Sequence, residues 1–330
     1  MQRQRQINEW LTSLFPNEIF TLAPASADAS FRRYFRATFR DKSLIVMDAP
    51  PQHEDCKPFL HIGKLFEDAG VHVPHVHAQD LAHGFLLLSD MGASTYLQIL
   101  NQDNASQLYA SATDALIKIQ LSSRENELPS YDEALLRREL NLFPEWYIAK
   151  HLGVTLTKKQ SDNLERTFHR ILTNNLAQPK VYVHRDYHSR NLMVSEPNPG
   201  ILDFQDAVYG PITYDLASLF KDAYIKWEEE KIMDWVIRYW EKARKAGLPV
   251  REDFGEFYRD YELMGVQRHI KVLGIFARLY HRDGKDGYLK DMPLVMECLR
   301  SACERYIDLK PLHNLLIELE QHAAKNGATN

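Results

Sequence analysis

The pattern of apolar and polar residues predicts a β-rich front to the chain. Apolar side chains recur at helical spacing over residues 7–15, which predicts an amphipathic helix. A second helix is predicted over residues 58–69, where Gly70 ends the pattern. Short apolar runs bounded by turn residues predict β-strands in three further stretches, which are 20–50, 71–76 and 85–88.

Helical periodicity dominates from about residue 94 to the end, with one interruption. A short β-like island occupies residues 181–204, and its apolar runs predict a buried hairpin. A β-rich front, a turn at residues 90–92 and a helical back together predict two lobes joined by a hinge. We expect the N-lobe to cover residues 1–91 and the C-lobe to cover residues 92–330.

Composition narrows the class of protein. The 330 residues, 45% hydrophobic and 26% charged, are typical of a globular protein and suffice for two domains or for one two-lobed enzyme. A net charge of −5 gives no reason to expect a nucleic-acid partner. We expect neither a membrane span nor a secretory signal, because no apolar run has the required length or place. Cys56, Cys298 and Cys303 are scattered, which favours free thiols in the cytoplasm. The oligomeric state stays open.

The chemically most informative residues lie in the island. It reads V-Y-V-H-R-D-Y-H-S-R-N-L-M-V over residues 181–194 and G-I-L-D-F-Q-D over residues 200–206. Phosphoryl transfer needs Mg²⁺ held against the phosphates and a carboxylate that orients and deprotonates the attacking hydroxyl. We predict that Asp186 is this catalytic base.

Two residues after Asp186 carry oxygen ligands of the kind that Mg²⁺ prefers. Asn191 follows five residues later, and Asp203 comes after a turn. Short strands predicted over residues 192–194 and 200–202 return the chain, so Asn191 and Asp203 should lie at the same end of a hairpin. Each of the three is an ordinary turn residue when taken alone. Together, H-x-D-x-x-x-x-N and a strand-ending Asp-Phe follow the order of a kinase catalytic loop and its metal-binding aspartate.

The chain resembles the aminoglycoside phosphotransferase family over about residues 26–293, most specifically through this island. The resemblance implies an α+β, two-lobed protein-kinase-like fold with a small β-rich N-lobe and a large, mainly helical C-lobe. It also implies ATP as co-substrate and Mg²⁺ as cofactor. Residues 210–219 resemble the family's helix after the metal loop, where Asp215 would cap the helix and brace the catalytic loop. His184 is expected to support the loop structurally.

The nucleotide-covering hairpin is expected over residues 26–36, although it lacks G-x-G-x-x-G. Small residues there, Ser30 among them, would let backbone N–H groups approach phosphate. The third strand carries Met47 where protein kinases have a phosphate-binding Lys. We expect Arg32, Arg33 or Arg36 to replace that Lys. The alternative is that these arginines are solvated edge-strand charges.

Residues 84–92 resemble the hinge that binds adenine, which makes Leu88 and Asp90 nucleotide-binding candidates. A buried strand followed by a turn would explain the same residues. Two helical stretches, 136–147 and 267–278, combine charges with aromatic or apolar residues. They and the island supply the acceptor candidates, which are Arg137, Glu139, Gln205, Arg268 and Lys271. A basic helix face is also what an ordinary solvated helix shows.

Taken whole, these stretches resemble the amino-sugar kinases of peptidoglycan recycling, which phosphorylate the anomeric hydroxyl of N-acetylmuramate and N-acetylglucosamine. The expected partners are therefore ATP and a small sugar. A kinase of the aminoglycoside, choline or homoserine type remains an alternative. A protein kinase is disfavoured because D-F-G is replaced by D-F-Q at residues 203–205 and no A-P-E follows. A nucleotide-binding module without turnover is disfavoured because Asp186, Asn191 and Asp203 are all present, but the missing strand Lys keeps this alternative open.

Overall fold

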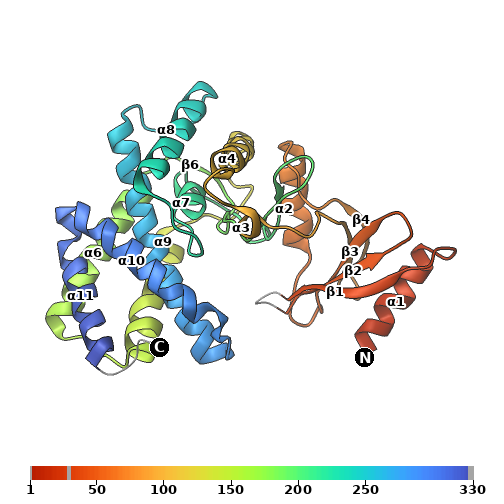
Figure 1. The fold of residues 1–330 in the computed structure, drawn as a ribbon, viewed down its shortest axis with the longest axis horizontal. Helices are drawn as coiled ribbons and strands as arrows, with labels where there is room; N and C mark the ends of the chain where they lie inside the picture. The colour runs from red at the N-terminus through yellow and green to blue at the C-terminus, as the bar shows by residue number, and fades with distance from the viewer. Residues whose placement is uncertain (1, 28–30, 326–330) are drawn as a thin grey trace. The chain divides into compact units, whose positions relative to one another are not determined.

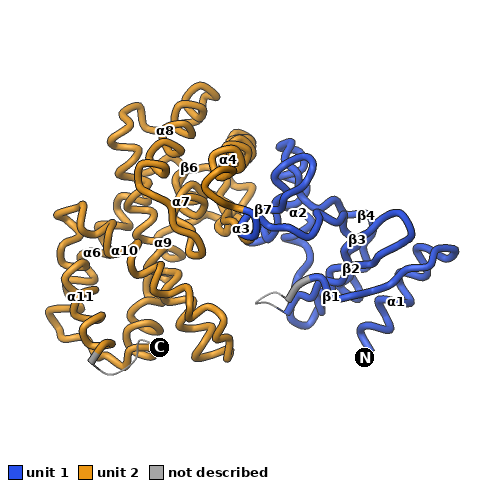
Figure 2. Tube along the Cα trace, viewed as in Figure 1, with its two compact units in different colours: residues 1–99, 191–206 blue, residues 100–190, 207–330 orange. Residues whose placement is uncertain are grey.

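The computed structural model describes residues 2–27 and 31–325. It divides into two compact units, which Figure 2 shows in blue and orange. Unit 1 comprises Met1–Ile99 and Asn191–Asp206, and unit 2 comprises Leu100–Arg190 and Ala207–Asn330. The lobe boundary expected between residues 91 and 92 stays a prediction.

A five-stranded sheet of antiparallel pairs forms the body of unit 1 (Figure 1). Helix α1 (Gln2–Leu14) lies against it, where Ile7 and Leu11 join Phe35 and Val46 in one buried cluster. The strands, in sheet order, are β1 (Thr21–Ala27), β2 (Arg33–Thr38), β3 (Ser43–Asp48), β5 (Phe85–Ser89) and β4 (Val76–Asp80).

Most elements predicted for the front are confirmed, with one error. The two predicted helices are α1 and α2 (Lys57–Asp68). The strand predicted over residues 71–76 is wrong, because β4 begins only at Val76. Pro74 has no backbone N–H to give to a sheet, and of the preceding residues His72 forms an isolated bridge and no strand.

The predicted hairpin of the island is present and belongs to unit 1. Its strands β7 (Leu192–Met193) and β8 (Gly200–Ile201) pair antiparallel, and they are shorter than predicted. Isolated bridges join this hairpin to His72 and to Thr95, which precedes helix α3 (Tyr96–Ile99). These bridges explain why a segment from the middle of the sequence is part of the front unit.

Unit 2 is mainly helical, as predicted, with one two-stranded sheet of β6 (Lys180–Val183) and β9 (Val208–Pro211). No helix in the described part of the chain combines the length and hydropathy needed to cross a bilayer. The helices are α4 (Ala105–Leu121), α5 (Glu133–Leu142), the π-helix η1 (Phe143–His151), α6 (Lys158–Leu176), α7 (Tyr214–Phe220), α8 (Glu229–Lys245), α9 (Phe254–Asp283), the 3₁₀ helix η2 (Asp286–Asp291), α10 (Met292–Arg305), the 3₁₀ helix η3 (Ile307–Leu309) and α11 (Lys310–Lys325).

Helix α9 is the centre of unit 2, because it is buried over most of its length and contacts α5, α6, α7, α10 and η1. Its close approach to the end of α5 requires a glycine. A Cβ at Gly274 would lie 2.5 Å from the backbone carbon and the Cβ of Leu142. This approach positions the α9 side chains that reach the catalytic island.

Replacing Gly274 by alanine should therefore force α9 away from α5. We expect Gly274→Ala to lower the free energy of unfolding by about 1–3 kcal/mol, the usual cost of overpacking a core. Urea denaturation of the purified protein measures this change. Gly287→Ala is the matched control, because no heavy atom lies within 4 Å of the added Cβ and its expected effect is below about 0.5 kcal/mol. Equal effects of the two substitutions would contradict the packing argument.

Candidate active site

A buried carboxylate fixes the loop that follows β6. Asp215 lies in the first turn of α7 and accepts the backbone N–H groups of His184 at 2.6 Å and of Arg185 at 3.0 Å. Arg185 has a φ of 77°, a left-handed conformation that costs free energy for a residue with a Cβ. The Asp215 carboxylate stabilises this turn of the backbone. The ring of His184 accepts the N–H of Asp186 at 3.2 Å, so it also holds the loop.

The expectation that Asp215 caps α7 is wrong. Thr213 occupies the cap position, and the carboxylate of Asp215 turns toward the loop instead. Asp215 is 1% exposed, and this burial raises its pKa to about 7. The two backbone N–H groups partly offset the burial by stabilising the ionised form.

Asp186 presents a partly exposed carboxylate in unit 2, since its side chain is 40% exposed. One guanidinium nitrogen of Arg268 lies 4.0 Å from Oδ1 of Asp186. Burial acts to raise the pKa of Asp186, but the positive charges of Lys271 and Arg268 outweigh burial and lower that pKa to about 2. Asp186 is therefore ionised at neutral pH and can accept a proton from a hydroxyl group.

A buried charge cluster supports the loop from α5 and α9. Glu139, 5% exposed, binds Arg185 at 2.5 Å and Lys271 at 3.0 Å and also accepts the hydroxyl of Tyr131. Lys271 further donates to the hydroxyl of Tyr214 at 2.8 Å. Of the predicted acceptor residues, the structure thus brings Glu139, Lys271 and Arg268 to the loop. All three are buried, and their role as acceptor ligands stays a prediction.

The predicted metal ligands lie together in unit 1. The amide nitrogen of Asn191 is 3.4 Å from Oδ2 of Asp203, and the backbone carbonyl of Asn191 accepts the N–H of Leu202 at 2.9 Å. The side chain of Gln205 donates to Oδ1 of Asp203 at 2.7 Å. No three His, Cys, Asp or Glu side chains gather as a metal cage among the described residues. A hard cation here would take its remaining ligands from phosphate oxygens and water, as Mg²⁺ does in kinases.

Apolar packing holds Asp203 in place. The next residue, Phe204, is fully buried and packs on the rings of Phe59 and Phe66 from α2, with centroids 4.8 and 5.9 Å away. A Cβ at Gly63 would come within 3.3 Å of the Phe204 ring, so the helix lies close to it. Asp203 itself has a φ of 61°. Such left-handed residues concentrate at functional sites, where the surrounding packing pays for the strain.

The three arginines predicted to replace the strand Lys have different partners. Arg33 binds the fully buried Asp48 at 3.1 Å, and Arg36 binds Asp90 through two contacts of 2.6 and 3.0 Å. Both guanidinium groups therefore bind carboxylates of unit 1, one at the end of β3 and one directly after β5. Arg32 differs, because its side chain is 3.8 Å from Oδ1 of Asp203, the predicted metal ligand.

The positions of Ser30, Leu88 and Met47 do not show whether these residues bind a nucleotide. Ser30 lies outside the described residues. Leu88 is 2% exposed within β5, and Met47 is 1% exposed between Tyr34 and Leu86 in the sheet. Their part in binding the nucleotide stays a prediction.

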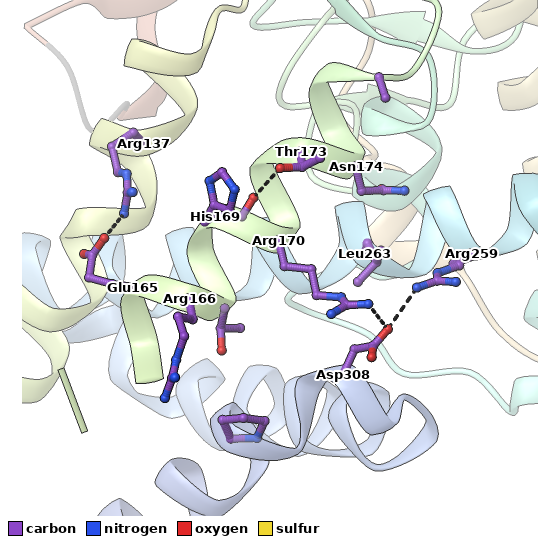
Figure 3. Close-up of a pocket in the computed structure, with 13 residues that line it drawn as sticks. Arg137, Glu165, Arg166, His169, Arg170, Thr173, Asn174, Arg259, Leu263 and Asp308 are labelled. Carbon is purple, nitrogen blue, oxygen red and sulfur yellow. Dashed lines mark hydrogen bonds and ion pairs between the residues drawn. The ribbon is translucent and has the colours of Figure 1, made fainter. Parts of the chain in front are cut away.

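Arg137 lies apart from the other acceptor candidates, in a cavity of about 930 Å³ (Figure 3). It binds Glu165 at 2.7 Å there, while Arg170 and Arg259 share Asp308. Neither Asp186 nor its charged neighbours line this cavity. Helix α5 thus places Arg137 in this cavity and Glu139 in the buried charge cluster beside the loop.

Two contacts of the loop were missed by the sequence analysis. Arg185 stands inside the H-R-D motif, yet its ion pair with Glu139 depends on a residue far away in the sequence. Asp222, 2% exposed, accepts the N–H and the hydroxyl of Ser189 at 3.0 and 2.5 Å. No local signal singles out Asp222, since it follows α7 as an ordinary turn residue.

Comparison with known proteins gives the chain its family. The model of the phosphotransferase enzyme family matches residues 21–254. The N-acetylmuramate/N-acetylglucosamine kinase of Pseudomonas aeruginosa is 52% identical, with 97% of this chain and 98% of that protein covered. The protein of the same name from Neisseria meningitidis is 53% identical, with 97% and 96% covered.

Solved structures are similar in fold at much lower identity. The choline kinase LicA from Streptococcus pneumoniae superimposes with a TM-score of 0.64 at 14% identity, covering 91% of this chain and all of that one. The ADP-bound aminoglycoside phosphotransferase APH(2'')-Ib gives a TM-score of 0.60 at 15% identity, covering 89% and 97%. These likenesses confirm the predicted kinase-like fold. The family match and the close relatives confirm the predicted resemblance, and the chain belongs to the phosphotransferase enzyme family.

Proposed function

We propose that the chain is a cytoplasmic, ATP-dependent kinase of peptidoglycan recycling, which phosphorylates the anomeric hydroxyl of N-acetylmuramate and N-acetylglucosamine to give sugar 1-phosphates. The observation that carries the acceptor is the similarity to N-acetylmuramate/N-acetylglucosamine kinases, which are more than half identical to this chain over 97% of its length. The family match supports phosphoryl transfer.

Asp186 is the catalytic base in this proposal. Its partly exposed carboxylate is held ionised by Arg268 and Lys271, so it can orient the acceptor hydroxyl and take its proton. A hemiacetal hydroxyl is more acidic than an ordinary alcohol, which eases this transfer. Asp215 and His184 are positioning residues, because they bind the loop backbone.

Asn191 and Asp203 are the proposed ligands of Mg²⁺. The carboxylate of Asp203 supplies charge, and the amide oxygen of Asn191 supplies a neutral ligand. When bound, the metal neutralises negative charge on the phosphates of ATP. Gln205 would hold one oxygen of Asp203 by its 2.7 Å hydrogen bond, which orients the carboxylate.

Arg32 is the proposed replacement for the missing strand Lys. It is the one of the three predicted arginines that approaches Asp203, whereas Arg33 and Arg36 bind carboxylates of the sheet. A guanidinium near the metal ligand can bind the phosphates as well as a lysine does, since its planar donors match phosphate oxygens.

An assay of ADP release over a panel of acceptors tests the function. The wild-type chain should turn over N-acetylmuramate and N-acetylglucosamine faster than choline or kanamycin, and phosphorus NMR should place the phosphate at C1. Asp186→Asn should lower kcat by about a hundredfold or more while ATP binding is nearly retained, because the carboxylate acts on the hydroxyl.

Three results would count against this account. Faster turnover of kanamycin or choline would overturn the acceptor, and so would a phosphate at C6. An Asp186→Asn variant that keeps more than about a tenth of wild-type kcat would remove Asp186 from the role of base.

The two metal ligands should differ in their effect. Asp203→Ala removes a charged ligand, so we expect a large loss of both rate and Mg²⁺-dependent nucleotide affinity. Asn191→Ala should be milder, because water can replace a neutral oxygen. Calorimetric titration of ATP at several Mg²⁺ concentrations measures the ranking. The reverse ranking would show that the two roles are exchanged.

Removing the Arg32 charge should raise the KM for ATP. A charged hydrogen bond contributes about 1.5–3 kcal/mol, so Arg32→Gln should raise the KM by about tenfold or more. Arg40→Gln is the matched control, because Arg40 is an exposed residue of the loop between β2 and β3. An unchanged KM in Arg32→Gln would assign the phosphates to another cation.

A further inference from the structure

One arginine close to the catalytic loop has an unusual setting in unit 2. The guanidinium of Arg190 lies over the ring of Tyr224, 3.5 Å from its centroid, and 5.8 Å from the centroid of Tyr288. A cation over an aromatic face is stabilised by the ring quadrupole. The two rings therefore help to hold the Arg190 guanidinium in place, together with a longer contact to the carboxylate of Asp291.

The rings beside Arg190 contact one another in a row. Tyr224 contacts Phe276 with centroids 6.1 Å apart, and Phe276 contacts Tyr288 at 5.1 Å. Phe276 is buried, whereas Tyr224 and Tyr288 remain partly exposed. We call Arg190, Tyr224, Phe276 and Tyr288 the arginine–tyrosine cluster. An apolar ring surface with a cation on it suits a ligand that is part apolar and part anionic.

The cluster is connected to the proposed base. His188 lies midway in sequence between Asp186 and Arg190, and its backbone N–H donates to the carbonyl of Asp186 at 3.0 Å. The ring of His188 meets Tyr224 edge-on, with centroids 5.5 Å apart. Nδ1 of His188 is buried and has no hydrogen-bond partner among the described residues. A ligand bound on the cluster would therefore lie beside residues that contact the backbone of Asp186.

The Arg190 guanidinium has N–H groups that can donate hydrogen bonds to a ligand. Its ionic contact within the described structure is with Asp291, at 3.5 Å, which is long for a charged hydrogen bond. Burial raises the pKa of Asp291, and the positive charge of Arg190 opposes this rise. The Arg190 side chain is 35% exposed, and a guanidinium carries five N–H donors. By contrast, Lys271 is 6% exposed and is bound to Glu139.

We propose that the arginine–tyrosine cluster is an acceptor subsite in which Arg190 binds the lactyl carboxylate of N-acetylmuramate. This inference rests on the proposed function and adds the residue that distinguishes its two acceptors. N-acetylglucosamine lacks the lactyl group, so it makes no ion pair with Arg190. The planar guanidinium fits a carboxylate through two parallel hydrogen bonds.

The ratio of kcat/KM for N-acetylmuramate to kcat/KM for N-acetylglucosamine tests the subsite. A hydrogen bond to a charged group contributes about 1.5–3 kcal/mol, which corresponds to a tenfold or greater change. We therefore expect Arg190→Gln to lower this ratio by about tenfold or more, mainly through the KM for N-acetylmuramate. Arg190→Lys keeps the charge but loses the planar fork, so it should lower the ratio less.

The matched control is Arg238→Gln, because Arg238 is an exposed arginine of α8 that binds Asp234 within the same helix. It should leave the ratio unchanged. The acceptors serve as internal controls for folding, since a misfolded variant would lose both activities together. If Arg190→Gln leaves the ratio unchanged, including by equal losses with both sugars, the subsite is overturned. A wild-type chain that phosphorylates neither sugar would overturn the proposed function itself.

Discussion

The loop that carries Asp186 depends on one carboxylate, that of Asp215, which accepts two backbone N–H groups of the loop. Without these bonds, Arg185 would have no reason to keep a left-handed backbone, and the direction of Asp186 would not be fixed. Keeping Asp215 buried has a cost. Its folded pKa of about 7 lies above the usual value, so its contribution to stability falls as the pH rises toward 7 and stays low above it.

Buried charges around the loop lower the pKa of Asp186. Glu139 balances Arg185 and Lys271, while Arg268 approaches Asp186. Replacing a buried ion cluster by apolar residues is often neutral for stability, so such clusters are weak evidence for a stabilising role. Here the net positive charge keeps Asp186 ionised, which a base needs. This arrangement requires α9 to lie close to α5, which Gly274 permits.

The sequence predicted the elements and the local motif well, because both depend on near neighbours. The spacing of Asp186, Asn191 and Asp203 was readable, and the hairpin that brings the last two together is present. The ion pairs of Glu139 and Arg33 could not be predicted from the sequence, because the partner of Glu139 is remote in the sequence and that of Arg33 lies on another strand. A basic stretch cannot show whether an arginine is buried, paired or available; those distinctions come from packing.

The most direct test of the account is a crystal structure of the chain with Mg²⁺, a non-hydrolysable ATP analogue and N-acetylmuramate. The anomeric oxygen should lie within hydrogen-bond reach of the Asp186 carboxylate, about 2.6–3.2 Å away. Mg²⁺ should contact Asp203. An anomeric oxygen that faces away from Asp186, with another hydroxyl in its place, would contradict the central claim.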